Sequence, residues 1–315
     1  MPKEEISEAE SRRLADLEIA DLNRRFYSGY DTNYFLQKCL YLSALLKQPQ
    51  AVSDTLAAGV EFKKLKFSVD AGDFLDKLPA NLKAEIVQTY FHAIETLFRL
   101  MFAHSATTDF PWLELSTQTS FKKFKQNVEK FTKKKYFVIP HEEGIGSLFY
   151  GHRKRPEPVP ADSWDKTIRN IDEYLNHFAK DLLQSYAYNS YKHGLAAFPD
   201  ELGFNFGGPE SMINVEKDDA LFILSHEPDK KREGYNLLNR HFIFSRWETK
   251  FALVFQITQL IENIIAVGRV RYAKGELKEL HSFDRVSLAQ MLLDKENPFQ
   301  PDSLKMSSIS FERRD

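Results

Sequence analysis

The chain has 315 residues, of which 43% are hydrophobic and 28% charged, and its formal net charge is −2. A chain of this length can bury a sizeable core, and its near-neutral charge excludes a global field that would draw it to nucleic acid or membranes. The single cysteine, Cys39, excludes an internal disulfide, and no uninterrupted apolar run is long enough to cross a membrane, so we expect a soluble, cytoplasmic protein.

The N-terminal part of the chain has the periodicity of amphipathic helices. Apolar residues recur at helical spacing in four segments, which predicts helices at 3–26, 33–46, 49–57 and 81–104. Residues 60–69 alternate only in part and predict a strand or an irregular extended piece. Pro79 and Asn81 are typical of a helix start, which places the beginning of the fourth helix near residue 81.

The middle of the chain differs from the N-terminal part in composition. A lysine-rich amphipathic helix is predicted at 119–135, and residues 136–139 have the composition of a short strand. Residues 144–161 hold three glycines and three prolines and therefore predict a loop or linker. A long helix is predicted to follow at 163–194.

The C-terminal part mixes strand and helix patterns. Residues 195–218 are rich in glycine and proline and predict a loop, whereas residues 221–224 and 241–244 predict the two strands of a β-hairpin. Residues 247–273 have a strong helical period. The residues from 294 onward predict an extended or disordered tail.

These elements predict a mainly α fold, a multi-helix bundle with a small β-hairpin addition. We expect an N-terminal helical part at 1–143 that includes the helix 81–104. A C-terminal helical part at 162–293 would carry the hairpin at about 220–245, and a tail would occupy 294–315.

Two of the predicted helices carry polar side chains where a core is expected. On the helix 81–104, four polar residues span about 60° of an otherwise apolar circumference: Gln88, His92, Glu95 and Arg99. On the helix 163–194, the apolar stripe continues without a change of register as Asn189 and His193. Because buried polar groups are costly unless paired, we expect the two stripes to meet, either as a structural network or as an active site.

The second stripe suits proton transfer. Asn189 and His193 are four residues apart, about 40° around a helix, so both side chains can address one point, with Lys192 on the flank. Together with Glu95 and Arg99, they supply a possible acid–base histidine and a cationic phosphate binder. This set suits RNA phosphodiester cleavage without a metal ion.

The helix 81–104 and the string Tyr188-Asn-Ser-Tyr-Lys-His-Gly194 resemble the HEPN superfamily, the all-helical domains of prokaryotic toxins and defence RNases. The resemblance implies RNA as substrate or ligand, an obligate dimer with the site at its interface, and a role in toxin–antitoxin systems or phage defence. It implies these candidate catalytic residues: His193, Asn189, Lys192, Arg99, Glu95 and His92. His104 is a further candidate, because Arg99 and His104 reproduce the literal arginine-to-histidine spacing, although they lie about 140° apart on a regular helix.

Basic residues gather between the two stripes in sequence. A track for an RNA backbone is one interpretation and a solvated helix face is the other. The candidate nucleic-acid-binding residues are Lys122, Lys123, Lys125, Lys133, Lys134, Lys135, Arg153, Lys154 and Arg155. No metal-ligand spacing and no phosphate-binding glycine loop occurs in the sequence, so we expect neither a metal nor a cofactor.

The alternative function is that of a non-catalytic helical interaction or regulatory protein whose polar network is structural. Leu253, Ile257, Leu260 and Ile264 give the helix 247–273 a second apolar face beside its main stripe. This face predicts a homodimer, and an antitoxin or another protein is a further possible partner.

Overall fold

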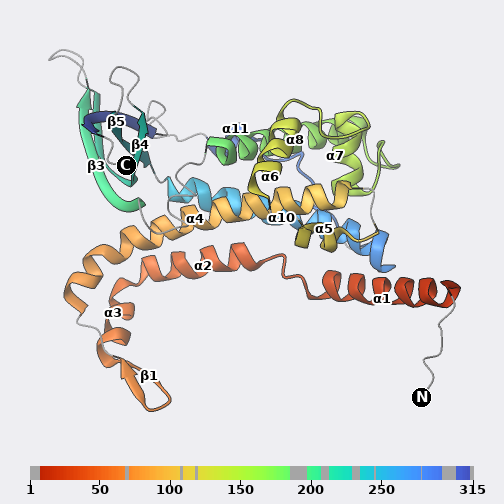
Figure 1. Cartoon of the computed structure of the whole chain (residues 1–315), viewed down its shortest axis with the longest axis horizontal. Coiled ribbons are helices and arrows are strands. Elements are labelled where there is room, and N and C mark those ends of the chain that lie inside the picture. The colour runs from red at the N-terminus through yellow and green to blue at the C-terminus, as the bar shows by residue number, and fades with distance from the viewer. Residues whose placement is uncertain are drawn as a thin grey trace. The chain divides into compact units, whose positions relative to one another are not determined.

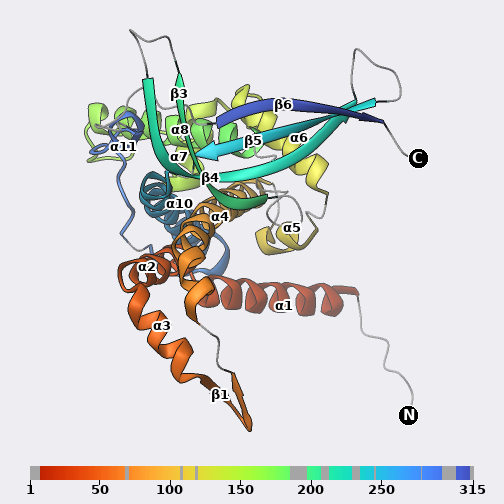
Figure 2. The same cartoon turned by 90° about the vertical axis from the view of Figure 1, so that its left-hand side faces the viewer.

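The structure is a computed structural model of the chain (Figures 1 and 2). It describes residues 8–67, 71–106, 109–117, 120–184, 197–206, 213–228, 235–244, 246–277, 279–292 and 303–312. Two compact units are present, and each is assembled from separate stretches of the chain. Unit 1 comprises Met1–Tyr34, Ala93–Gln184 and Phe255–Met291, and unit 2 comprises Phe35–His92, Ser185–Val254 and Leu292–Asp315. These units do not follow the contiguous division into 1–143 and 162–293.

The predicted mainly α class is confirmed. The helices of the described chain are α1 Glu8–Gly29, α2 Tyr34–Lys47, α3 Pro49–Ala58, α4 Ala71–Ser105, α5 Pro111–Thr117, α6 Phe121–Thr132, α7 His141–Tyr150, α8 Ala161–Gln184, α10 Trp247–Ala273 and α11 Leu288–Leu292. The strands are β1 Val60–Phe62, β2 Leu65–Phe67, β3 Ala197–Phe206, β4 Ile213–Pro228, β5 Tyr235–Phe244 and β6 Ser303–Glu312.

Unit 1 is a helical bundle built on amphipathic faces. α6 places Phe124, Val128 and Phe131 in the core, as expected of an amphipathic helix, and Ser120 caps that helix by accepting a hydrogen bond from the backbone N–H of Lys123. α8 buries the whole stripe that its spacing predicts, including Ile171, Leu175 and Phe178.

Unit 2 contains the β structure. β1 and β2 form a small antiparallel hairpin, and β3, β4, β5 and β6 form a four-stranded antiparallel sheet in that order (Figure 2). The predicted hairpin is β4–β5, in which Leu221 pairs with Ile243. Cys39 is fully buried in this unit, and burial raises the pKa of its thiol to about 12, which makes it an inert core residue.

The strand content is larger than the sequence predicts. The composition of residues 195–218 predicts a loop, but β3 and the start of β4 lie there. The residues at 294–315 have the composition of an extended or disordered tail, but Ser303–Glu312 pair with β5 as the fourth strand. Both strands depend on partners far away in sequence, as the pairing of Tyr235 with Glu312 illustrates.

Three local predictions are wrong. α4 begins at Ala71 and runs through Pro79, so Asn81 lies inside the helix and does not cap it. Proline removes one helical hydrogen bond, and burial of Leu78 and Leu82 beside it favours the continuous helix. Residues 136–139 form no strand, and the predicted loop 144–161 begins as α7, leaving only residues 151–160 irregular.

α10 is long and apolar enough to cross a membrane by length and composition, but 72% of its most apolar window is buried inside the protein. The second apolar face of α10, from which a dimer is predicted, is buried within the chain, since Leu253, Ile257, Leu260 and Ile264 are all fully buried. α10 is therefore a largely buried core helix.

Candidate functional site

The polar stripe of α4 contains an internal ion pair. Nε and Nη2 of Arg99 donate to Oε1 of Glu95, at 2.9 and 2.7 Å, and the guanidinium lies 4.6 Å from the centre of the Phe124 ring. Glu95 is buried and Arg99 is half-buried, so the pair packs α4 against α6. Gln88 is buried as well, whereas His92 is exposed and meets the ring of Phe35 edge-on at 5.1 Å.

The other half of the proposed catalytic set is Asn189, Lys192 and His193, and these residues lie outside the described part of the chain. The expected meeting of the two polar stripes therefore stays a prediction. Among the candidates that are described, Glu95 and Arg99 are brought together as their spacing predicts. His104 lies on the same helix but has other partners.

His104 lies at the C-terminal end of α4, buried between helices of unit 1. Its Nδ1 is 2.7 Å from the carbonyl oxygen of Leu100, and its Nε2 is 2.8 Å from the hydroxyl of Tyr27 on α1. Because a carbonyl oxygen only accepts hydrogen bonds, Nδ1 of His104 carries the ring proton. Nε2 then accepts a hydrogen bond from the hydroxyl group of Tyr27. Tyr272, near the end of α10, stacks on Tyr27 and meets His104 edge-on.

This environment keeps the imidazole of His104 neutral. Its pKa is lowered to about 4: burial is the main cause, the hydrogen bond to Leu100 opposes it, and the positive charge of Arg271 acts in the same direction as burial. Since both ring nitrogens are engaged and the ring is uncharged at neutral pH, His104 orients the Tyr27 hydroxyl and is not a free acid–base group. Spacing alone suggests a catalytic partner for Arg99, whereas the actual partners of His104 come from α1 and α10.

A cavity of about 520 Å³, which we call the His104 cavity, opens beside this residue. Its rim carries the exposed arginines Arg153 and Arg271, and its walls include Tyr136 and Tyr272. Nη2 of Arg271 donates to the carbonyl oxygen of Ser147, at 3.2 Å, which holds the guanidinium over α7. The lining comes from segments far apart in sequence, so no motif in the sequence predicts this cavity.

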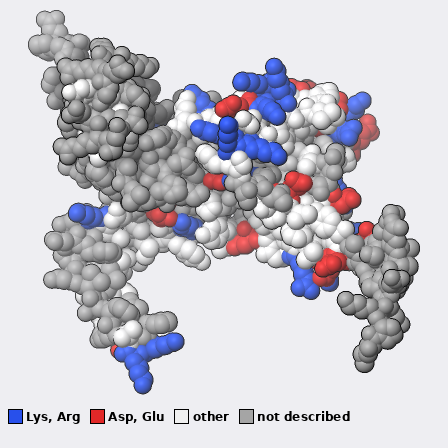
Figure 3. Space-filling view, in the orientation of Figure 1, with Lys and Arg blue, Asp and Glu red and all other residues white. Residues whose placement is uncertain are grey.

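The predicted nucleic-acid-binding residues all lie in unit 1. Lysine and arginine side chains gather over the region of α6, α7 and α8, with acidic side chains among them (Figure 3). All of the candidates are exposed except Lys125, which is half-buried. Lys133, Lys134 and Lys135 directly precede residues 136–139, which line the His104 cavity, and Arg153 belongs to both groups.

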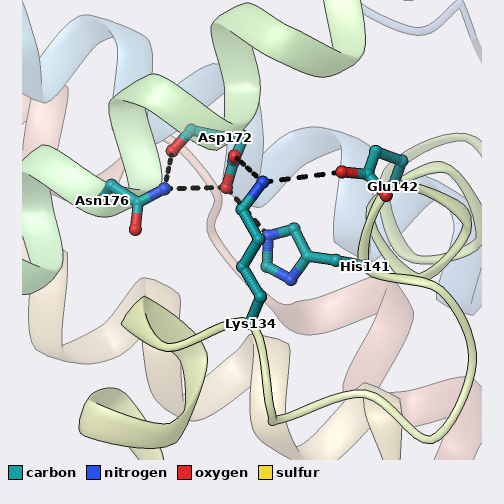
Figure 4. Close-up of polar contacts among 5 residues, drawn as sticks. All are labelled: Lys134, His141, Glu142, Asp172 and Asn176. Carbon is teal, nitrogen blue, oxygen red and sulfur yellow. Dashed lines mark hydrogen bonds and ion pairs between the residues drawn. The ribbon is translucent and has the colours of Figure 1, made fainter.

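Lys134 is the basic candidate whose charge is already used within the protein. Its Nζ lies 3.3 Å from Asp172 and 3.5 Å from Glu142, and Asp172 also accepts hydrogen bonds from His141 and Asn176 (Figure 4). The charge of Asp172 raises the pKa of Lys134. Partial burial acts to raise the pKa of Asp172, but the hydrogen bond from His141 and the charge of Lys134 outweigh it and hold that pKa below its ordinary value.

Within the described residues, no group of three or more His, Cys, Asp or Glu side chains is arranged to hold a metal ion. The chain matches no protein-family model, no curated protein and no solved structure. A function is therefore inferred from the geometry of unit 1.

Proposed function

We propose that the protein binds single-stranded RNA through unit 1, with a backbone phosphate held by Arg153 and Arg271 at the rim of the His104 cavity. The observation that carries this proposal is the convergence of two exposed arginines and two tyrosines on one cavity of about 520 Å³. A cavity of this size accommodates a small ligand such as one nucleotide.

The chemistry of the rim supports a phosphate and a base together. An arginine guanidinium presents paired donors that match phosphate oxygens, and tyrosine rings offer surfaces on which an unstacked base can pack. His104 adds no positive charge at neutral pH, because its pKa is lowered to about 4. The affinity for phosphate therefore depends on the arginines.

The neighbouring basic residues extend this surface. Lys133 and Lys135 precede the wall of the cavity, and Lys154 and Arg155 follow Arg153. An RNA strand that leaves the cavity in either direction would meet further positive charge, which supplies the non-specific part of the affinity. Lys134 contributes least, since Asp172 and Glu142 already neutralise it.

This proposal can be tested by measuring the fluorescence anisotropy of a labelled single-stranded RNA over a range of salt concentrations. The double variant Arg153→Gln, Arg271→Gln is expected to bind about tenfold more weakly, because two charged hydrogen-bond donors are removed from the rim. The slope of log affinity against log salt should also become shallower, by about 0.7 for each phosphate that is no longer neutralised.

The matched control is Arg169→Gln, which removes an exposed arginine of α8 that does not line the cavity. It should leave both affinity and salt slope close to those of the unmodified protein. If the control and the double variant bind RNA equally weakly, the loss of affinity would reflect the loss of positive charge in general and not the position of the two arginines at the cavity. Unchanged binding by the double variant would contradict the proposal.

RNA cleavage is the further part of the proposed function, and it comes from the HEPN resemblance. In that interpretation, His193 moves the proton, Asn189 and Lys192 support it, and the Glu95–Arg99 pair orients the phosphate, with His92 beside them. The cytoplasmic location, the homodimer and the role in toxin–antitoxin systems or phage defence belong to the same proposal.

The cleavage part has its own experiment. Purified protein is incubated with total RNA or tRNA in the presence of a metal chelator, beside His193→Ala. We expect the unmodified protein to degrade RNA and the variant to lose the activity about 100-fold or more, since acid–base catalysis contributes at least that much. Degradation that persists unchanged in His193→Ala would remove this residue from catalysis, and the RNA-binding proposal would still stand.

A further inference from the structure

A second cavity of unit 1, which we call the Trp164 pocket, has a different character. It encloses about 320 Å³ on the side of α7 that faces Trp164. Its walls are mainly apolar, from Tyr150, Pro156, Val159, Trp164, Leu277 and Leu280, and its polar lining residues are His152, Ser163, Thr167 and Ser282. The rings of Tyr150 and Trp164 are 5.4 Å apart and meet edge to face, so they form an aromatic corner.

One side of this pocket is a short row of hydroxyl groups. Ser163 donates to Oδ2 of Asp284 at 2.7 Å, and Ser282 donates to Oδ1 of the same carboxylate at 2.9 Å. The oxygens of Thr167 and Ser282 are 3.3 Å apart. Ser282 has one hydroxyl proton and uses it in the hydrogen bond to Asp284. Thr167 must therefore be the donor in its hydrogen bond with Ser282.

The direction of these hydrogen bonds determines what the pocket offers a ligand. All three hydroxyl protons point within the row, so Ser163 and Ser282 present only oxygen lone pairs to the cavity. The hydrogen bonds from Ser163 and then Ser282 also hold the pKa of Asp284 below its ordinary value, and the carboxylate behind the row stays negative. This side of the pocket therefore favours a hydrogen-bond donor and disfavours an anion.

We propose that the Trp164 pocket binds an uncharged aromatic molecule that carries an N–H donor, with its ring against Trp164 and Tyr150 and its N–H directed at Ser163 and Ser282. The volume is at the lower end of the range for ligand pockets and limits the ligand to a small ring system. This site is separate from the RNA surface and does not depend on it, since it presents acceptors where the His104 cavity presents arginines.

The proposal predicts a preference between two molecules of the same shape. Indole carries a ring N–H, and benzofuran has an oxygen in that position, so only indole can donate to the serine oxygens. We expect indole to bind with roughly millimolar affinity and benzofuran about three- to tenfold more weakly, the effect of one hydrogen bond. The readout is the side-chain indole N–H signal of Trp164 in two-dimensional ¹H–¹⁵N NMR of the full chain, assigned with the variant Trp164→Phe.

Variants connect this preference to the hydroxyl row. In the double variant Ser163→Ala, Ser282→Ala, the advantage of indole over benzofuran should disappear while weak binding of both remains. Ser116→Ala, which removes an exposed serine of α5, should keep the advantage. If the double variant does not fold, the comparison of indole with benzofuran in the unmodified protein decides alone. Equal binding of the two molecules, or no change in the Trp164 signal, would overturn the proposal.

Discussion

Lowering the pH from about 7 to about 4 is expected to cost the folded protein about 3 kcal/mol through His104 alone. In the unfolded chain this histidine has the ordinary pKa of 6.5, whereas in the folded protein its pKa is about 4. Between these values the unfolded state binds more protons, so the free energy of unfolding falls as the pH falls. At about 1.4 kcal/mol for each pH unit, the loss reaches its full size near pH 4.

Urea unfolding at about pH 7 and about pH 4 measures this loss. His104→Gln carries no titrating group, so its stability should depend less on pH by about 3 kcal/mol, even though it is less stable at neutral pH. The exposed histidine of the loop after α7 provides the control, because His152→Gln should keep the pH dependence of the unmodified protein. The same pH dependence in His104→Gln and His152→Gln would show that His104 protonates without penalty.

Replacing Gly268 with alanine is expected to destabilise the protein by about 1–3 kcal/mol. A Cβ at this position of α10 would lie 2.5 Å from a ring carbon of Tyr27. That ring is buried, stacked on Tyr272 and hydrogen-bonded to His104, so it has little room to move. The strain and the weakened hydrogen bond should exceed the gain of about 1 kcal/mol that alanine brings to a helix interior.

The control for this substitution is Gly29→Ala at the end of α1, where an added Cβ meets nothing within 4 Å. It should change the free energy of unfolding by no more than about 0.5 kcal/mol. Urea denaturation of both variants gives the comparison. A Gly268→Ala protein as stable as Gly29→Ala would mean that the Tyr27 ring yields without cost.

Helices with a complete local signal could be predicted closely from the sequence. The helix predicted at 247–273 is α10 to the residue, because its apolar period is strong, and the helix predicted at 119–135 contains α6, which begins at the Ser120 cap. Pro79 misplaced the start of α4, because proline is a local signal that packing around it can override. β6 was missed because a strand at the end of a polar tail is defined only by its pairing with β5.

For the candidate sites too, the sequence predicts contacts between nearby residues of one helix but not contacts between distant segments. Glu95 and Arg99 are four residues apart on one helix, and the sequence predicts their pairing directly. The role of His104 could not be predicted, since its partner Tyr27 is 77 residues away. Both cavities are likewise assembled from distant segments. The hydrogen-bond directions around Ser163 and Ser282 follow from a carboxylate more than 100 residues from Ser163.

The two glycines inside α7 each lie against residues that line a different cavity. Gly144 lines the His104 cavity and would place a Cβ 2.4 Å from the Phe137 ring, and a Cβ at Gly146 would lie 2.7 Å from the backbone oxygen of His152 and 3.0 Å from the indole of Trp164. Gly144 is thus packed against a residue of the His104 cavity, whereas Gly146 is packed against two residues that line the Trp164 pocket. A side chain added at Gly144 would press on the His104 cavity, and one added at Gly146 would press on the Trp164 pocket, so each cavity can be altered separately from this one helix.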